Sequence, residues 1–269
     1  MLTIFYSFLS IGFLGILLGV GLAAVARFLA LKKDERVSQI EALLPGANCG
    51  SCGFAGCAAY ADAIINAQAD PALCTPGGRA VADRIGAFLG VSVNYAGERK
   101  IAQICCRGSR KASAVKYRYQ GLQDCNALKP IFNGDKVCSF GCLGLGSCQR
   151  VCPSGAIVRH QEGYLYVLRD LCIACGRCLK VCPVGVIRWV PYEADLFVAC
   201  HSRDKGGEVR KYCEVGCIGC SICQKKSPQG GFVIENYLAS IDYEQTGGRE
   251  EALAACPRKC ILPVAISEK

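Results

Sequence analysis

The sequence predicts an α+β fold in which a single N-terminal transmembrane helix precedes a small helical domain and two repeated domains of mixed helix and strand. Three observations predict this order. Residues 1–26 contain no charged side chain, 22 of the 269 residues are cysteines at short regular spacings, and the second half of the chain repeats one cysteine pattern. A chain of this length suffices for one large domain or for two to three small ones.

The first 26 residues form the predicted membrane anchor. As a helix they would be about 39 Å long, which is enough to cross a hydrocarbon core of about 30 Å with some tilt. Arg27, Lys32, Lys33 and Arg36 follow directly. Because positive residues mark the cytoplasmic flank of a membrane helix, we expect the rest of the chain on the cytoplasmic side.

A cleaved secretory signal is the alternative for this segment, with Ala24-Val25-Ala26 as the cleavage site. The segment lacks a positively charged start, however, and its apolar run is longer than that of a signal peptide. Export would also place the cysteines under oxidising conditions. We therefore expect an anchor that remains attached.

The cysteine spacings predict iron–sulfur clusters. A density of cysteine this high also occurs in disulfide-rich secreted proteins, but repeated C-x2-C and C-x3-C-P runs are typical of iron–sulfur proteins. Such clusters need reduced thiolates and hence a reducing compartment. The formal net charge is +9. Each [4Fe–4S] cluster with its thiolates carries roughly −2, so four clusters would leave about +1, and we expect no nucleic acid as a partner.

The first group of cysteines is Cys49-x2-Cys52-x4-Cys57, followed by Cys74. We expect these four thiols to bind one [4Fe–4S] cluster, with three of them on a tight loop. Zinc is the alternative because four soft ligands suit it as well, although zinc sites more often use two separated C-x2-C pairs. Short helices are expected around the loop, at 34–44, 58–67 and 77–89.

A complete bacterial ferredoxin motif follows later in the chain, as Cys172-x2-Cys175-x2-Cys178-x3-Cys182-Pro183. In this motif the first three cysteines bind one cluster and the fourth binds the neighbouring one. A second motif is therefore required nearby, and the fold around it should be ferredoxin-like.

The second motif precedes the first and is altered at one position. Cys142, Cys148 and Cys152 stand where the motif requires them, but Leu145 replaces its second cysteine. We expect Cys138 to be the substitute. Interleaved ligation then predicts two [4Fe–4S] clusters. Their ligand sets are Cys138, Cys142, Cys148 and Cys182 for one, and Cys152, Cys172, Cys175 and Cys178 for the other.

A second ferredoxin-like pair of motifs follows, and it retains the ligands of only one cluster. The lost set falls on Ser227, Thr246, Arg249 and Ala252. The remaining set is Cys217, Cys220, Cys223 and Cys256. Interleaved ligation explains why a whole set is lost together, and it predicts a fourth [4Fe–4S] cluster here.

The two ferredoxin-like domains also repeat outside these motifs. Cys138-Ser-Phe-Gly-Cys142 resembles Cys213-Glu-Val-Gly-Cys217, and an apolar strand that ends in a cysteine precedes each, at 101–105 and 196–200. Six cysteines remain unassigned: Cys105, Cys106, Cys125, Cys200, Cys213 and Cys260. Buried free thiols, further cluster ligation and a disulfide such as Cys105–Cys125 all remain open for them.

These motifs divide the chain into five parts. We expect a transmembrane anchor at 1–31, a small helical [4Fe–4S] domain at 32–91, a connecting segment with strand and helix at 92–135, a ferredoxin-like domain with two clusters at 136–192, and a second, degenerate ferredoxin-like module with one cluster at 193–269.

Together these features resemble the B subunit of the Rnf complex, the ion-translocating ferredoxin:NAD⁺ oxidoreductase of bacterial membranes. The charge-free N-terminal segment, the run from Cys49 to Cys57 with Cys74, and the segment from Cys138 to Cys148 carry the resemblance, which extends over essentially the whole chain. It is similar to the longer form of this protein, with a second ferredoxin module. The chain departs from that form at Ser227, Thr246, Arg249 and Ala252.

The resemblance implies a place in the bacterial cytoplasmic membrane and a role in electron transfer. Proteins of this family take electrons from soluble ferredoxin and pass them to the other membrane subunits, where NAD⁺ is reduced and Na⁺ or H⁺ is moved. The sequence contains no dinucleotide-binding G-x-G-x-x-G between a strand and a helix, and no series of membrane spans. We therefore expect an electron carrier with no catalytic residues of its own.

Two other functions fit the same features. A membrane-anchored redox subunit could use these clusters to reduce a regulatory protein or to sense for it. A zinc-binding interaction module is the third interpretation, and iron analysis distinguishes it from the other two.

Overall fold

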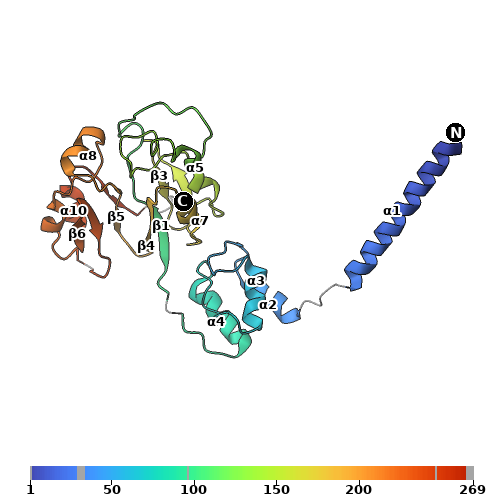
Figure 1. Ribbon diagram of the computed structural model, residues 1–269. Helices are drawn as coiled ribbons and strands as arrows, with labels where there is room; N and C mark the ends of the chain where they lie inside the picture. Colours follow the sequence, from blue (N-terminus) through green and yellow to red (C-terminus); the bar gives the residue numbers. More distant parts are fainter. Residues whose placement is uncertain (1, 29–33, 96, 246, 265–269) are drawn as a thin grey trace.

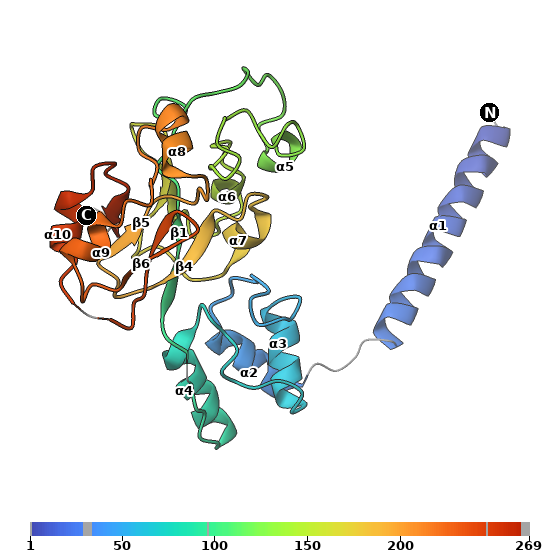
Figure 2. The same cartoon turned by 60° about the vertical axis from the view of Figure 1, so that its left-hand side comes forward.

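The computed structural model describes residues 2–28, 34–95, 97–245 and 247–264. Helix α1 stands apart from the rest of the chain, the small helical domain lies in the middle, and two mixed modules lie at the other end (Figure 1, Figure 2). The predicted α+β fold class is confirmed.

Helix α1 (Leu2–Phe28) has no packing partner within the described residues. Its apolar stretch Ile4–Val25 is long enough to cross a membrane, and every side chain in that stretch is exposed. An apolar helix is stable only when other apolar groups cover it, so this stretch suits a membrane or a contact with partner helices. Arg27 lies in its last turn. Lys32 and Lys33, which belong to the predicted basic flank, lie outside the described residues.

Three short helices form the small domain: α2 (Glu35–Leu43), α3 (Cys57–Ile65) and α4 (Gly78–Leu89). They lie within two residues of the predicted ranges at each end. Ile40, Tyr60 and Ile85 are fully buried between them. The Tyr60 hydroxyl donates a hydrogen bond to Asp70 O at 2.7 Å and accepts one from Leu73 N at 3.1 Å. This pair of bonds fixes the segment that leads to Cys74.

The first mixed module contains two antiparallel strand pairs and three short helices. Its outer pair is β1 (Lys100–Ile104) with β4 (Ile187–Pro191), and its inner hairpin is β2 (Ile157–Arg159) with β3 (Leu165–Val167). Its helices are α5 (Cys125–Leu128), α6 (Ser147–Arg150) and α7 (Arg177–Val181). Strand β1 falls in the predicted connecting segment, and its pairing with β4 makes that part of the segment an integral strand of the module.

The second module repeats this arrangement. Its outer pair is β5 (Leu196–Val198) with β8 (Ile261–Pro263), and its inner hairpin is β6 (Phe232–Glu235) with β7 (Leu238–Ile241). Its helices are α8 (Gly206–Tyr212), α9 (Ile222–Lys226) and α10 (Glu250–Ala255). In each module the first strand pairs with the last, so the motifs between them are held in one compact unit.

Backbone hydrogen bonds join the two modules along a seam. Arg107 N donates to Ala199 O at 3.0 Å, Ala114 N donates to Tyr212 O at 2.7 Å, and Glu214 N donates to Ala112 O at 2.9 Å. The modules are therefore held to each other by main-chain contacts.

Three of the four positions that lack the expected cysteine in the second module are buried. Ser227 and Ala252 are buried, and Arg249 is only 7% exposed. The Arg249 guanidinium donates from Nε to Gly230 O at 2.7 Å and pairs with Asp195 Oδ1 at 2.8 Å. Thr246, the other predicted position of the lost set, lies outside the described residues.

Arg249→Ala should destabilise the second module. The substitution leaves a void and removes a charged hydrogen bond to a buried carbonyl, so we expect a loss of about 2–3 kcal/mol in unfolding free energy and a lower thermal midpoint. The thermal midpoint is measured by circular dichroism of the cluster-loaded protein under anaerobic conditions. The exposed Arg210→Ala is the control and should leave the midpoint unchanged. An Arg249→Ala midpoint equal to that of the control would show that the buried arginine contributes nothing.

Candidate iron–sulfur sites

The 22 cysteines are all free thiols in the structure, so the Cys105–Cys125 disulfide that the sequence left open is not formed. Cys105 is buried among Ile101, Val190 and Phe197. Burial raises the pKa of its thiol to about 12. A protonated thiol in an apolar core behaves as a small hydrophobic side chain, which is the simplest of the three alternatives for this residue.

The structure brings the four predicted ligands of the small domain together. Burial raises the pKa of the Cys74 thiol, and the nearby Cys57, Cys52 and Cys49 sulfurs raise it further. The Asn48 side chain secures the loop, because its Oδ1 accepts a hydrogen bond from Cys57 N at 2.8 Å. A Cβ on Gly56 would lie 2.8 Å from that same oxygen, so a larger residue here would displace the Asn48 side chain.

The predicted ligand set of Cys152, Cys172, Cys175 and Cys178, around the complete ferredoxin motif, is also brought together. Burial raises the pKa of Cys178 to about 12, and the neighbouring Cys172, Cys175 and Cys152 sulfurs contribute to the shift. The motif loop turns sharply at Gly176, whose φ of 71° favours glycine. This set agrees with the predicted interleaving.

The structure does not bring the other predicted set of this module together. Cys142, Cys148 and Cys182 line one cavity, but the fourth thiol on it is that of Cys125. Cys138 lines a different cavity. The nearby Cys125 sulfur also contributes to raising the pKa of the buried Cys148 thiol to about 12.

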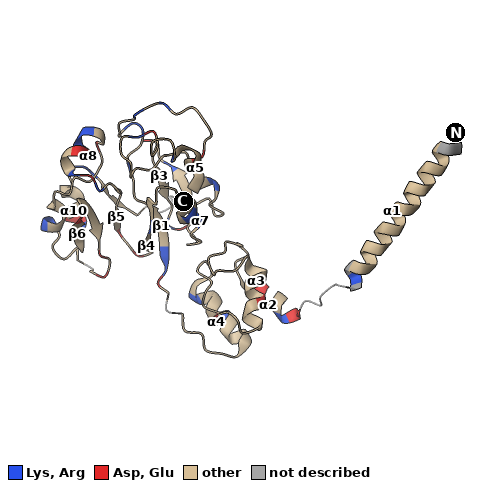
Figure 3. Cartoon of the chain, in the orientation of Figure 1, with Lys and Arg blue, Asp and Glu red and all other residues tan. Residues whose placement is uncertain are grey.

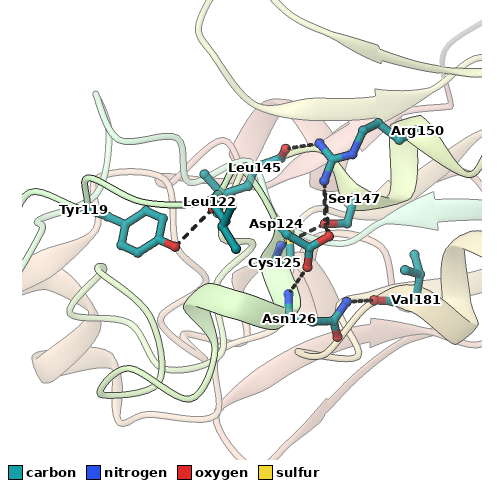
Figure 4. Close-up of polar contacts among 9 residues, drawn as sticks. All are labelled: Tyr119, Leu122, Asp124, Cys125, Asn126, Leu145, Ser147, Arg150 and Val181. Carbon is teal, nitrogen blue, oxygen red and sulfur yellow. Dashed lines mark hydrogen bonds and ion pairs between the residues drawn. The ribbon is translucent and has the colours of Figure 1, made fainter.

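Hydrogen bonds hold Cys125 in this place (Figure 4). Cys125 N donates to Ser147 Oγ at 2.8 Å, and Asn126 Nδ2 donates to Val181 O at 3.5 Å. Asp124 caps α5 and pairs with Arg150 at 3.4 Å. These contacts dock α5 against α6 and α7, the helices beside Cys148 and Cys182. Sequence reasoning missed Cys125 because it lies far from the motif, where spacing carries no information.

The second module brings its four predicted ligands together and adds a fifth thiol. Cys217, Cys220, Cys223, Cys256 and Cys260 line one cavity. The sulfurs of Cys256 and Cys260 lie 3.7 Å apart, and the contact between these two thiols lowers the pKa of Cys256 to about 5.

Zinc and an iron–sulfur cluster require different spacings of four thiols. Four sulfurs on one zinc ion lie within about 4 Å of each other, because each Zn–S bond is about 2.3 Å. Among the described residues, no three Cys, His, Asp or Glu side chains converge closely enough to hold one metal ion. Four thiols around a shared cavity instead fit a [4Fe–4S] cubane, in which each thiolate binds its own iron.

The small domain contacts the first module beside one of these sets. Arg177 Nη2 donates to Asn48 O at 2.6 Å. Cys49 is close enough to act on the pKa of Cys175, which burial raises. One thiol of the small-domain set therefore lies beside one thiol of the ferredoxin set.

Comparisons with known proteins agree with this chemistry. The FeS family model, which describes an Fe-S cluster, matches residues 44–76, and the LdpA Fe-S cluster-binding domain matches residues 133–193. The first match lies within the small domain, and the second covers the part of the first module that carries the ferredoxin motifs.

Three curated relatives match along nearly the whole chain, and each is the B subunit of a redox complex. The B subunit of the ion-translocating oxidoreductase complex of Methanosarcina acetivorans is 40% identical to this chain. The match covers 92% of this chain and 94% of the relative. The B subunit of the proton-translocating ferredoxin:NAD(+) oxidoreductase complex of Clostridium ljungdahlii is 37% identical, over 93% of this chain and 89% of the relative. The B subunit of the Na(+)-translocating ferredoxin:NAD(+) oxidoreductase complex of Acetobacterium woodii is 36% identical, over 93% of this chain and 75% of the relative.

Proposed function

Since this chain belongs to the family of B subunits of ion-translocating oxidoreductase complexes, we propose that it carries electrons from reduced soluble ferredoxin to the other membrane subunits of such a complex. Bound clusters supply one-electron transfer, and the residues of the chain hold the clusters in line and limit their contact with water. Two relatives are named for different ions, H⁺ and Na⁺, and either ion fits the proposal.

Cys220 supports an electron-accepting surface on the second module. It is the one exposed cysteine among the 22, all of which lie in the described residues. A cluster held by Cys220 would lie near the surface, where a soluble donor can approach it. The other cysteines are buried or half-buried, which favours transfer inside the protein over transfer to unrelated partners.

The contact between Asn48 and Arg177 is the observation that carries the proposal. It places the small-domain thiols, which follow the membrane anchor in the chain, directly beside the first module. Inside the first module, the Cys178 sulfur contributes to raising the pKa of Cys148. The two ligand sets of this module are therefore neighbours as well. Electrons that reach the first module therefore have a short way to the domain nearest the anchor.

We infer [4Fe–4S] ligation at four places from these positions. The sets of the small domain, the complete ferredoxin motif and the second module are those that the sequence predicts. In the remaining set we propose Cys125 in place of Cys138, because Cys125 lines the cavity of Cys142, Cys148 and Cys182.

Helix α1 supports a single-pass anchor in this proposal. Its exposed apolar surface and Arg27 at its C-terminal end favour a cytoplasmic position for the modules. An anchor of this kind keeps the chain beside its partner subunits and raises their effective concentration.

Charge reversal near Cys220 should slow electron uptake. Lys225 and Lys226 are exposed on α9, close to that thiol, and the modules carry further basic residues (Figure 3). A ferredoxin is anionic through its cluster, so these lysines should steer its approach. For Lys225→Glu/Lys226→Glu we expect a second-order rate constant of reduction about tenfold lower at low salt, measured by stopped-flow absorbance.

The matched control is Arg79→Glu/Arg84→Glu, which changes the net charge equally on the exposed face of α4. Its rate constant should stay within about twofold of the unaltered chain. Equal slowing by both variants would mean that ferredoxin responds to the overall charge and does not dock at the second module.

A further inference from the structure

A third cysteine-lined cavity lies between the two modules, and none of the predicted sets accounts for it. Its volume of about 20 Å³ equals that of the cavities in the modules. Four thiols line it: Cys106, Cys138, Cys200 and Cys213. We call it the junction cavity. Four is the number of thiolates that a cubane cluster requires.

Each module contributes two of these thiols. Cys106 and Cys138 come from the first module, and Cys200 and Cys213 come from the second. Cys138 and Cys213 hold equivalent positions in the internal repeat, four residues before Cys142 and Cys217. The backbone seam fixes them against each other, because Ser113 bridges to Cys213 and Ala114 N donates to Tyr212 O at 2.7 Å.

Backbone N–H groups lie near all four sulfurs, as they commonly do at cluster ligands. Cys106 Sγ accepts a hydrogen bond from Cys142 N at 3.3 Å. At the other three, the N–H group two residues further along the chain lies near the sulfur: Phe140 at Cys138, Ser202 at Cys200 and Val215 at Cys213. The motif ligands Cys142, Cys175 and Cys217 show the same pattern, with donors at Gly144, Arg177 and Gly219. The junction thiols thus sit in loops of the cluster-binding type.

Glycines border the junction cavity where sulfurs approach the backbone. A Cβ on Gly108 would lie 3.5 Å from Cys213 Sγ and 3.6 Å from Cys106 Sγ. A Cβ on Gly141 would lie 3.6 Å from Cys138 Sγ. A larger residue at either position would extend into the space between the thiols.

A buried cation faces the same cavity. Lys136 is 2% exposed and lines it, and its ammonium donates to Gly108 O and to Cys142 O. Among the described residues, Lys136 forms no ion pair with a carboxylate. A buried ammonium without an anionic partner is costly. A cluster with four thiolates carries roughly −2 and would supply the missing negative charge.

We propose that Cys106, Cys138, Cys200 and Cys213 bind a fifth [4Fe–4S] cluster, which joins the two modules. This cluster would lie between the thiol sets of the two modules. On one side, Cys217 N donates to the Cys200 sulfur, and on the other, Cys142 N donates to the Cys106 sulfur. The binding of this cluster is supported by the junction cavity, its four thiols and the buried Lys136. Its role as a relay between the modules rests on the proposed function.

Metal analysis of the full-length chain, reconstituted anaerobically, tests the site. Five clusters correspond to about 20 irons per chain, and Cys213→Ser should lower the count to about 16. The control is Cys105→Ser, which removes the buried thiol next to Cys106 and should keep about 20. Electron paramagnetic resonance of reduced Cys213→Ser should retain the signals of the other four clusters, which excludes general unfolding.

A count of about 16 irons in the unaltered chain, unchanged by Cys213→Ser, would overturn the proposal, as would one zinc per chain at this site. Cys200→Ser gives the same test if Cys213→Ser does not fold. None of these measurements involves ferredoxin, so the site stands or fails independently of the proposed donor. If the fifth cluster is present but its loss leaves transfer between the modules at the same rate, the relay role alone fails.

Discussion

Removal of the iron and sulfide is expected to unfold both ferredoxin-like modules. Their strands are three to five residues long and occur as separate two-stranded pairs. Their helices span four to seven residues. Isolated hairpins and helices this short are at best marginally stable in water, so the free energy of cluster binding must supply much of the free energy of folding.

The measurement is circular dichroism with limited proteolysis before and after anaerobic chelation. We expect the cooperative thermal transition of the modules to disappear and residues 97–264 to become protease-sensitive. Helix α1 in detergent is the internal control, because its backbone bonds are local and it should stay helical. A chelated protein that keeps a cooperative transition and protease resistance would show that the cores around Ile157 and Ile261 suffice without clusters.

Deletion of residues 1–33 is expected to abolish electron delivery to the membrane complex while leaving reduction by ferredoxin intact. The anchor contributes no cluster ligand, so the truncated chain should bind its full iron content. Without the anchor, delivery becomes a bimolecular step, and at micromolar protein we expect it to slow by about 10²–10⁴-fold. Reoxidation of the reduced clusters after addition of membranes that lack the native chain measures this rate.

A matched control separates anchoring from recognition of α1 itself. Replacement of α1 by an unrelated single-span helix should restore delivery if the helix acts only as an anchor. Restoration would assign the effect to effective concentration, and failure to restore would assign it to contacts between α1 and partner helices. Unchanged delivery by the truncated chain would contradict a role for the anchor.

Much of the fold could be predicted because its determinants are local. The uncharged N-terminal segment, the helices around Cys57 and the interleaved motifs each depend on short-range spacing. Strand β1 lies where the sequence predicts an apolar strand, at 101–105, but its pairing with β4 spans more than eighty residues and leaves no local signal.

The ligand at the altered motif position shows the same limit. Cys138 is nearer in sequence to Cys142, but Cys125 reaches the cavity because Ser147 and Val181 dock α5 there. The repeat did contain a usable signal. Cys138 and Cys213 are equivalent positions, so a role for one implied a role for the other, and only the contact between the modules shows that the two meet.

Freeze-quench electron paramagnetic resonance of the complete complex in membranes tests most directly whether this chain carries the electrons. We predict that its clusters are reduced by ferredoxin before NADH appears and are reoxidised when NAD⁺ is added. Lys225→Glu/Lys226→Glu should delay both the reduction of the clusters and the appearance of NADH. NADH formation at an unaltered rate while these clusters remain oxidised would contradict the proposed role of this chain.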